Sequence, residues 1–463
     1  MIVVDEFAGQ TVTVLGLGRS GLTAARALAA GRADVRGWDD DDSARAAARN
    51  AGIPTCDPAH LNWPDMAALV ASPGVPLQRP HVHTLVARAR DAGVPIVGDI
   101  ELFARSGQVA AMVGITGTNG KSTTTALLGH ILKEAGRSVT MGANLGDPVL
   151  DFQPLGADGV YVLELSSFQL ELTESLRCDV AVLLNLSPDH LDRHGSMSGY
   201  VAAKRRVFAQ CQPPQTAIVG IDDELSRAVL EDLRARGDAA VAPISGERAC
   251  DGVFVLERTL YERTGGASFE AALSTASHLP GFHNMQNAAA AFAAARALGV
   301  APAVAADGLR SFPGLVHRLQ DLGRVGGVRF INDSKATNGA ATAQALACFD
   351  DIYWIAGGRA KEGGIDALTP HFGRIRHAFL IGEAAGALAG TLAGQVPHTV
   401  AGDLRCAVVA AFEKAQAEAV TTAVVLLSPA CASFDQWPDF EARGKAFQAY
   451  VAELAEPATE ASA

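Results

Sequence analysis

The stretch from Met112 to Thr124 constrains this chain more than any other part of the sequence. Residues Met112–Thr116 are mostly apolar and predict a buried strand, and the run Gly117-Thr118-Asn119-Gly120-Lys121-Ser122-Thr123 follows directly. A glycine-rich turn between a strand and a helix presents backbone N–H groups and a helix N-terminus to an anion. The lysine at the end of the turn supplies a charge for β- and γ-phosphates, and the serine hydroxyl can bind Mg²⁺. The stretch therefore predicts a triphosphate site in an α/β domain.

The spacing differs from the usual phosphate-loop pattern G-x-x-x-x-G-K-[ST]. That pattern places a glycine where this chain has Ile115, and the nearby glycines are Gly114 and Gly117. The Gly-Lys-Ser end and the strand–turn–helix context are intact, so we expect the same chemistry. The alternative is an ordinary glycine-rich turn without a ligand.

Length and charge limit the class of protein. A chain of 463 residues predicts roughly three domains. The net charge of −12 argues against a duplex nucleic-acid binder, which usually has a basic face. The seven cysteines form no C-x-x-C pair, which favours reduced thiols in a cytoplasmic protein over disulfides or zinc. We find no signal-peptide pattern and no apolar run of ~18 residues, so we expect no membrane span.

The first 99 residues predict a ligand-binding domain of their own. Strand Thr11–Leu15 leads into the turn Gly16-Leu17-Gly18-Arg19-Ser20-Gly21, and a second strand ends in Asp39. This G-x-G-x-x-G pattern with a later acid is typical of dinucleotide binding, but the same turn could hold another diphosphate, including that of a UDP-sugar. A third strand ends in Ser72-Pro73-Gly74, where ligand-binding loops gather in open α/β sheets.

Residues 100–313 predict a second domain around the phosphate loop. Glu164 lies inside an apolar run, and a buried carboxylate is costly unless it is paired or binds a metal; an acid on a solvated face is the alternative. His190 follows a buried strand and could bind a metal or phosphate, or be structural. Lys204 by itself has the pattern of a surface lysine. Asn284 and Asn287 share a helix face, although an asparagine at a helix start can be a simple cap.

Residues 314–463 predict a third domain of alternating strands and helices. Its strands end in two polar segments, Asp333-Ser334-Lys335-Ala336-Thr337-Asn338 and Ser428-Pro429-Ala430-Cys431-Ala432-Ser433. Across the chain, this alternation predicts an α/β protein with three open, mostly parallel sheets and flanking helices. The first and third would be Rossmann-like, and the second a phosphate-loop ATPase domain.

Together these motifs resemble those of the Mur ligases over nearly the whole chain. They occur in the family's order: G-T-N-G-K-S-T, E-L-S-S-F-Q-L, the Asp-His pair, Y-V-A-A-K, H-N-x-x-N, H-R-L, N-D-S-K-A-T-N and S-P-A-C-A-S-F-D-Q. The last two are similar to the member that joins D-glutamate to UDP-N-acetylmuramoyl-L-alanine. The D-N-P-R signature usual in the ligase for the third residue is absent.

The resemblance implies an ATP-dependent amide-bond ligase of peptidoglycan precursor synthesis. The L-alanyl carboxylate would attack the γ-phosphate of ATP to form an acyl phosphate. The amine of D-glutamate would then attack the acyl carbon, and ADP and phosphate would be released. The protein would position the reactants and neutralise charge. We expect a monomer in the cytoplasm that binds these small molecules and no nucleic acid.

The resemblance also implies roles for individual residues. Lys121, Glu164, His190 and Lys204 would be catalytic. Ser122 and Glu164 would bind the Mg²⁺ that bridges ATP, His190 would bind a second Mg²⁺, and Lys204 would be carbamylated to become an anionic metal ligand. The residues implied to bind ATP are Gly117, Thr118, Asn119, Gly120, Lys121, Ser122, Thr123, Asn284, Asn287, Arg318 and Asp333. Those implied to bind the UDP-linked substrate are Gly18, Arg19, Ser20, Asp39, Asp40, Ser72 and Asn144. Those implied to line the glutamate pocket are Lys335, Thr337, Lys361, Ser433 and Phe440.

Three alternatives remain at this point. A folylpolyglutamate synthase also joins glutamate to a carboxylate, but typically lacks the first domain. The second alternative is an NAD(P)-dependent oxidoreductase, which only the turn Gly16–Gly21 supports. The third is an interaction protein that binds ATP but catalyses no ligation. The chain also departs from the family pattern at Ala143, where glycine is frequent, and in the basic loop Gly357–Lys361.

Overall fold

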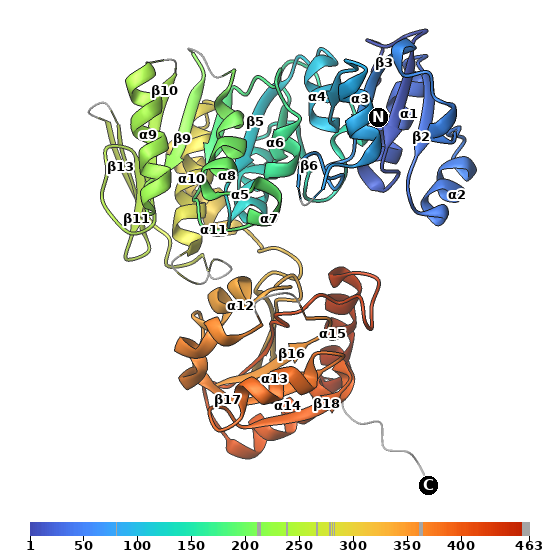
Figure 1. Ribbon diagram of the computed structural model, residues 1–463. Coiled ribbons are helices and arrows are strands. Elements are labelled where there is room, and N and C mark those ends of the chain that lie inside the picture. The colour runs from blue at the N-terminus through green and yellow to red at the C-terminus, as the bar shows by residue number, and fades with distance from the viewer. Residues whose placement is uncertain are drawn as a thin grey trace. The chain divides into compact units, whose positions relative to one another are not determined.

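The computed structural model describes residues 1–79, 81–210, 214–237, 239–264, 267–276, 279, 281, 283–360 and 364–455. Within these residues the strands form three sheets of four, nine and six strands, which are mostly parallel and flanked by helices (Figure 1). The predicted fold class is therefore confirmed. The chain divides into two compact units: unit 1 comprises Met1–Ala276 and Asn284–Phe312, and unit 2 holds the described residues from Pro313 on. We keep 1–99, 100–313 and 314–463 as proposed domains.

The N-terminal sheet of unit 1 is parallel and has the strand order β2-β1-β3-β4. Its elements are β1 (Thr11–Leu15), α1 (Arg19–Ala30), β2 (Asp34–Trp38), α2 (Asp42–Asn50), η1 (Pro58–His60), η2 (Trp63–Asp65), β3 (Met66–Ala71), α3 (Thr84–Asp91), β4 (Ile96–Val97) and α4 (Asp99–Arg105). Helix α1 packs with one hydrophobic cluster and α3 with another, so that the sheet is covered on both faces.

Helix α1 begins at Arg19, inside the glycine-rich turn. Gly18 is the N-cap, and the glycine-rich turn is thus shared between loop and helix. Gly21 in the first turn lies so close to Gly16 that an added Cβ would be 1.7 Å from the Gly16 carbonyl oxygen. Only glycine allows this approach between helix and strand end.

The central sheet of unit 1 has the order β13-β12-β11-β10-β9-β8-β5-β7-β6. Its elements are β5 (Ala111–Thr116), α5 (Lys121–Glu134), β6 (Val139–Ala143), η3 (Val149–Asp151), β7 (Val160–Glu164), α6 (Ser167–Glu171), β8 (Val180–Leu183), α7 (Leu191–His194), α8 (Met197–Arg205), η4 (Arg206–Phe208), β9 (Thr216–Gly220), α9 (Glu224–Arg236), β10 (Ala240–Ser245), β11 (Val253–Leu256), β12 (Thr259–Thr264), β13 (Ala267–Ala272), α10 (His283–Ala297) and α11 (Pro302–Ser311). The short β elements predicted near 237–278 are strands β10 to β13, of which β12 and β13 pair antiparallel.

The middle strands of this sheet position the candidate site. β7 and β8 are buried at every residue, as is usual for parallel strands with both faces covered, and they lie on either side of β5. Because the three strands are parallel, their carboxyl ends meet at one edge. The loops after Thr116, Glu164 and Leu183 therefore start side by side.

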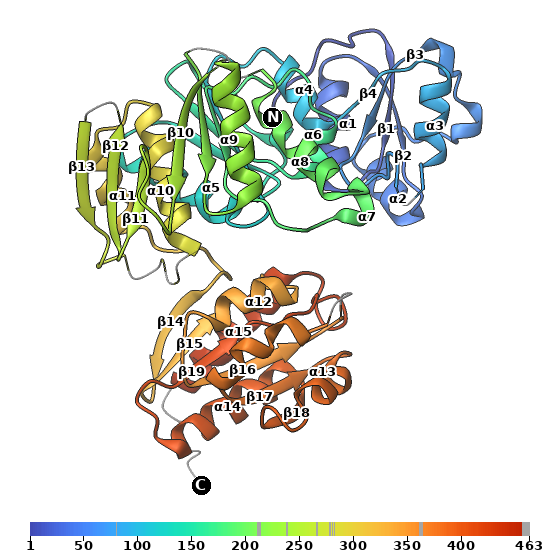
Figure 2. The ribbon, with the colours of Figure 1, turned by 60° about the vertical axis from the view of Figure 1, so that its left-hand side comes forward.

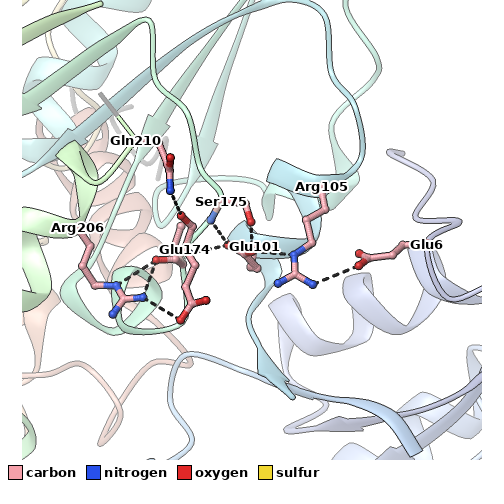
Figure 3. Close-up of polar contacts among 8 residues, drawn as sticks. Glu6, Glu101, Arg105, Glu174, Ser175, Arg206 and Gln210 are labelled. Carbon is pink, nitrogen blue, oxygen red and sulfur yellow. Dashed lines mark hydrogen bonds and ion pairs between the residues drawn. The ribbon is translucent and has the colours of Figure 1, made fainter. Parts of the chain in front are cut away.

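A shared core and a polar network join the two sheets of unit 1. One hydrophobic cluster contains residues of α1 and of β7, so the two sheets are not separately packed. Glu101 on α4 accepts hydrogen bonds from the backbone N–H groups of Glu174 and Ser175, at 2.7 and 2.9 Å, and from Arg105 (Figure 3). Arg105 also pairs with Glu6. Helix α4 is thereby held between the chain start and the loop after α6.

Unit 2 is a six-stranded sheet with the order β14-β15-β19-β16-β17-β18, in which only β14 is antiparallel to its neighbour among the described strands (Figure 2). Helices α12 and α13 pack with one hydrophobic cluster, and α14 and α15 with another that contains the alternate residues of the same strands. The elements are β14 (Gln320–Val325), β15 (Val328–Asn332), α12 (Gly339–Leu346), β16 (Ile352–Gly357), η5 (Asp366–Arg374), β17 (Ile375–Ile381), α13 (Ala385–Leu392), β18 (His398–Gly402), α14 (Leu404–Glu418), β19 (Val424–Leu427) and α15 (Phe440–Ala455). In the described part of the chain, no helix is both long and apolar enough to cross a membrane.

We expect Glu101→Ala to destabilise unit 1 by about 1–3 kcal/mol at pH 7, because buried donors lose their acceptor. Burial raises the pKa of Glu101, but hydrogen bonds from Ser175, Glu174 and Arg105 lower it more, so the net pKa lies below the ordinary 4.5. The stabilisation by the carboxylate is therefore complete above about pH 4.5 and is lost as pH falls through the folded-state pKa. Denaturant unfolding at several pH values checks this. Glu6→Ala, at the exposed end of the network, is the control and should cost at most about 1 kcal/mol.

Candidate active site

The phosphate loop spans Gly117 to Gly120 between β5 and α5. Gly117 has φ +148° and Gly120, the N-cap of α5, has φ +85°, so both adopt conformations that favour glycine. An added Cβ on Gly120 would lie 2.1 Å from Oδ1 of Asn287. Helix α5 begins at Lys121, directly after the left-handed Gly120.

Two lysine side chains meet at the carbonyl oxygen of Gly117. Nζ of Lys121 donates to this oxygen at 2.9 Å and to the Thr118 oxygen at 2.8 Å, and Nζ of Lys204 donates to the Gly117 oxygen at 2.8 Å. Lys204 is 2% exposed. Burial, and then the charge of Lys121, lower the pKa of Lys204 well below its usual value, against the effects of Asp189 and Glu164. Taken by itself, Lys204 was predicted to be a surface lysine, and that prediction is wrong.

The rest of the loop is held by the segment after β8 and by α10. Thr118 N donates to the Asn185 oxygen at 2.9 Å, and Asn119 N donates to Oδ1 of Asn185 at 2.9 Å. Asn287 accepts a hydrogen bond from Thr124 and donates to Oδ1 of Asn284 at 3.0 Å. The two asparagines are buried, as are Ser122 and Thr123 on α5. Asn284 and Asn287 thus face the loop rather than capping a helix in solvent.

Glu164 is the last residue of β7 and is 3% exposed, so the alternative of a solvated acid is wrong. Its Oε1 accepts a hydrogen bond from Nδ2 of Asn144 at 2.7 Å. Its Oε2 is buried and has no hydrogen-bond partner among the described residues. A buried carboxylate oxygen in this state is costly, and a bound cation would satisfy it.

His190 lies at the N-terminus of α7 in a left-handed conformation, with φ +51°. Its side chain is half exposed, and Nε2 lies 3.4 Å from Oδ2 of Asp189. The ring of Phe168 packs against it with a centroid distance of 4.8 Å. The imidazole is therefore oriented by neighbours but remains open to a ligand.

These residues have the chemistry of a phosphate and cation site, although the described residues contain no group of three or more His, Cys, Asp and Glu side chains arranged for a metal. The oxygen ligands predicted for a divalent cation are the hydroxyl of Ser122 and Glu164, whose Oε2 has no hydrogen-bond partner among the described residues. A further anionic ligand would complete such a set, and Lys204 would supply one if it were carbamylated. The donor set fits Mg²⁺ under that condition.

A cavity of about 440 Å³ lies between the N-terminal and central sheets. The predicted residues Gly18, Arg19, Ser20, Ser72 and Asn144 all line it. Nη2 of Arg19 donates to the Gly146 oxygen across the cavity, and Ser72 Oγ donates to the Gly16 oxygen at 2.7 Å. The structure therefore brings these predicted residues together.

Asp39 is not among the residues that line this cavity. Its Oδ2 accepts a hydrogen bond from Leu17 N at 2.6 Å and its Oδ1 from Asp41 N at 2.9 Å, so its carboxylate supports the glycine-rich turn. Asp40 accepts a bond from Nε1 of Trp38.

The sequence did not single out Gln169, which lines the cavity and is buried. The signal was present, since Ser166 and Gln169 form a capping box that fixes the start of α6.

In unit 2, Asp333 is buried directly after β15. It accepts hydrogen bonds from Ser428 Oγ at 2.9 Å and from Leu319 N at 3.1 Å. Burial raises the pKa of Asp333 to about 7, against the lowering effects of Ser428 and Arg318. The segment that carries Arg318 is backbone-strained, with φ +61° at His317.

The residues predicted for a glutamate pocket lie on neighbouring loops of unit 2. Nζ of Lys335 lies over the ring of Phe440, 5.4 Å from its centroid, and Thr337 N donates to the Lys335 oxygen at 2.8 Å. Ser433 is buried. Lys361 lies outside the described residues.

Arg443 joins these loops and was missed by the sequence analysis. It is fully buried, donates through Nε to Ser334 Oγ at 3.0 Å, and donates through Nη1 and Nη2 to the Cys431 oxygen at 3.2 Å. Burial lowers the pKa of Arg443 to about 10. An arginine near the start of a C-terminal helix gives no signal of burial from the sequence alone.

Comparisons with known proteins agree on one family. The model described as the Mur ligase middle domain matches residues 115–295. A protein of Caulobacter sp. (strain K31), named UDP-N-acetylmuramoylalanine–D-glutamate ligase, is 52% identical over 466 residues and covers 99% of each chain. A protein of Rhodospirillum rubrum with the same name is 50% identical over 463 residues, covering 98% of this chain and 97% of its own.

Solved structures share the fold at lower identity. A UDP-N-acetylmuramate–alanine ligase from Thermotoga maritima aligns with a TM-score of 0.56 and 19% identity, over 96% of this chain and 99% of its own. A pseudomurein peptide ligase type C from Methanothermus fervidus aligns with a TM-score of 0.56 and 17% identity, over 96% of this chain and 100% of its own. At these identities the likeness concerns the fold alone.

We expect Gly120→Ala to disrupt the phosphate loop, because the new Cβ meets Asn287 and the left-handed φ is strained. Binding of a fluorescent ATP analogue should weaken by at least about tenfold, the equivalent of about 1.4 kcal/mol. Gly136→Ala is the matched control: Gly136 follows the other end of α5, has φ +76°, and has open space around its added Cβ. Gly136→Ala should introduce a similar left-handed backbone strain but leave the affinity for the ATP analogue unchanged. Equal loss in both variants would contradict a specific role of the Gly120–Asn287 contact.

Proposed function

The chain belongs to the Mur ligase family, and we propose that it joins D-glutamate to UDP-N-acetylmuramoyl-L-alanine while ATP is converted to ADP and phosphate. The observation that carries the proposal is the full-length identity of about half to proteins named for this reaction. The product is a peptidoglycan precursor, so the reaction serves cell wall biogenesis, and with it cell shape and division.

The phosphate loop supports the ATP-dependent half of the reaction. Backbone N–H groups of Gly117–Gly120 and the N-terminus of α5 would surround the phosphates. Lys121 would leave the loop carbonyls and neutralise charge on the γ-phosphoryl group as the substrate carboxylate attacks it. Asn284 and Asn287 would support the nucleotide from α10, and Arg318 and Asp333 would contribute from unit 2.

The unsatisfied Oε2 of Glu164 supports a cation at the end of β7. Two bound Mg²⁺ ions would screen the repulsion between the triphosphate and the carboxylate that attacks it. Ser122 and Glu164 would hold one ion and His190 the other.

The low pKa of Lys204 supports its carbamylation. A neutral amine at Nζ attacks the carbon of CO₂ and loses one proton, which gives a carbamate with one negative charge. Carbamylation would relieve the repulsion between Lys204 and Lys121 and supply anionic oxygens beside Glu164. Lys121 would then be the remaining ammonium near the Gly117 oxygen.

The cavity of about 440 Å³ supports binding of the UDP-linked substrate. Gly18, Arg19 and Ser20 would hold its diphosphate at the N-terminus of α1, where backbone N–H groups and the helix dipole favour an anion. Ser72 would contact the same end, and Asn144, whose amide bonds Glu164, would contact the muramoyl-alanyl part. Asp39 and Asp40 would lie near the uridine of the substrate. Asp39 would contribute by holding the glycine-rich turn in place.

Lys335, Thr337, Lys361, Ser433 and Phe440 would form the glutamate pocket. Cations and hydroxyls suit an amino acid with two carboxylates. The fixed positions of Ser433 and Phe440 depend on Arg443, which joins the loops that carry them.

We also propose that the protein is a cytoplasmic monomer. Sedimentation equilibrium should give a mass near 47.9 kDa with and without substrates. A mass twice as large would contradict this part of the proposal.

We predict that phosphate release requires ATP, Mg²⁺, UDP-N-acetylmuramoyl-L-alanine and D-glutamate together. A coupled phosphate assay that omits each component in turn, with L-glutamate in parallel, measures this requirement. The expected result is release with D-glutamate and none above background with L-glutamate. Hydrolysis of ATP at the same rate without glutamate would contradict a ligase, and tight binding of NADH would favour an oxidoreductase.

We predict that Lys204→Ala lowers kcat by about 10²–10⁴-fold, because an anionic oxygen ligand is lost from the phosphate site. Short carboxylates such as acetate or formate should restore part of the activity by occupying the space of the missing carbamate. Lys133→Ala, which changes an exposed lysine on α5, is the control and should leave kcat unchanged. An alanine variant with full activity, or one that carboxylates do not rescue, would contradict carbamylation of Lys204.

A further inference from the structure

Arg193 on α7 contacts two other segments of unit 1, the turn after β3 and helix α6. Its Nη1 donates to the backbone oxygen of Val75 at 2.8 Å. Its Nε and Nη2 donate to Oε2 of Glu171 at 3.0 and 2.8 Å. Its guanidinium carbon lies 4.4 Å from the centroid of the Phe168 ring. The side chain is 7% exposed.

The contact with Val75 reaches the wall of the proposed substrate cavity. Val75 N donates to the Ser72 oxygen at 3.0 Å, which closes the turn Ser72–Val75. Ser72, Pro73 and Gly74 of this turn line the cavity of about 440 Å³. Arg193 therefore holds one edge of the cavity from the central domain.

The other contacts reach His190. The ring of Phe168, covered by Arg193, packs against the imidazole of His190. The backbone N–H groups of Arg193 and His194 both donate to the His190 oxygen at 3.1 Å, and His190 is held at φ +51°. A left-handed histidine is strained, so it needs surrounding contacts to keep this conformation.

Glu171 and His194 complete the arrangement. Nδ1 of His194 lies 3.0 Å from Oε1 of Glu171, and its Nε2 lies 3.0 Å from Oγ of Ser167. Burial lowers the pKa of His194, which favours the neutral ring; Nδ1 then donates to Glu171 and Nε2 accepts from Ser167. Both oxygens of Glu171 are thus engaged, one by Arg193 and one by His194.

We propose that Arg193 is a positioning residue that links the turn Ser72–Val75 of the substrate cavity to His190 at the phosphate site. The inference rests on the proposed function for the roles of the two sites, but the link itself rests on the contacts of Arg193. A planar guanidinium can donate to Val75 and Glu171 at the same time while it stacks on Phe168, whereas an ammonium cannot. Because coupling between two sites is reciprocal, a ligand in the cavity also restrains the His190 loop.

Hydrogen–deuterium exchange of the whole protein tests the link without relying on activity. The variants are Arg193→Ala, Arg193→Lys and the matched control Arg206→Ala. Arg206 on η4 also donates to a backbone oxygen, that of Thr173, and pairs with Glu174, but within the described residues no hydrogen bond or ring contact joins it to Phe168 or Val75. Exchange is followed in peptides that cover residues 72–79 and 189–196, with and without UDP-N-acetylmuramoyl-L-alanine.

In the unsubstituted protein, we expect the ligand to slow exchange in both peptides. In Arg193→Ala, both peptides should exchange faster without the ligand, and the ligand should protect 72–79 but no longer 189–196. Arg206→Ala should leave both patterns as in the unsubstituted protein. Thermal melting of each variant shows whether unit 1 remains folded.

Steady-state kinetics provide the second measurement. For Arg193→Ala we expect kcat to fall by about 10²-fold, as for a misplaced catalytic group, with the KM for D-glutamate unchanged. Arg193→Lys should restore the melting temperature more than it restores kcat, because it returns the charge without the planar fork.

The link is overturned if exchange of 189–196 in Arg193→Ala matches the unsubstituted protein, or if Arg206→Ala accelerates it equally. Full recovery of kcat in Arg193→Lys would also overturn it, since charge alone would then suffice. If the unsubstituted protein releases no phosphate with its substrates, the proposed function fails, while exchange without ligand still decides whether Arg193 restrains both segments.

Discussion

The carbonyl oxygen of Gly117 accepts hydrogen bonds from the Nζ atoms of two lysines, Lys121 and Lys204. Burial, and then repulsion from the charge of Lys121, lowers the pKa of Lys204 well below its usual value, so it is costly to bring the two side chains together. The loop tolerates it because strand β5 and helix α5 fix Gly117 in a conformation that favours glycine. The arrangement is suited to a polyanion, which would separate the two charges.

The order of the central strands places further candidate residues beside the phosphate loop. β5 lies between β7 and β8, so the loop, Glu164 and the segment with His190 begin at one edge of the sheet. A shared hydrophobic core and the hydrogen bond from Arg193 to the Val75 oxygen join the N-terminal sheet to the central sheet. The cavity and the phosphate loop therefore lie in one compact unit, while unit 2 carries its own set of polar loops after β15 and β19.

The fold was largely predictable from the sequence. Apolar runs ending in polar loops indicated buried parallel strands, and the glycines of the turns marked where the chain enters α1 and α5. Helices α1 and α5 begin inside these motifs, because a glycine N-cap places the first helical turn there. Several candidate residues, among them Arg19, Ser72 and Asn144, were named from motifs before the cavity that they share was known.

By itself the sequence indicated the local chemistry: a strand, a glycine turn, a lysine and a serine in that order favour a compact anion-binding loop. It could not determine which distant side chains face that loop. Lys204 and Arg193 are both buried, and their partners lie far away in the sequence: Lys204 contacts the phosphate loop, and Arg193 contacts the turn after β3 and helix α6. Burial and partner choice depend on contacts between segments far apart in the chain, and those are decided when the sheets assemble.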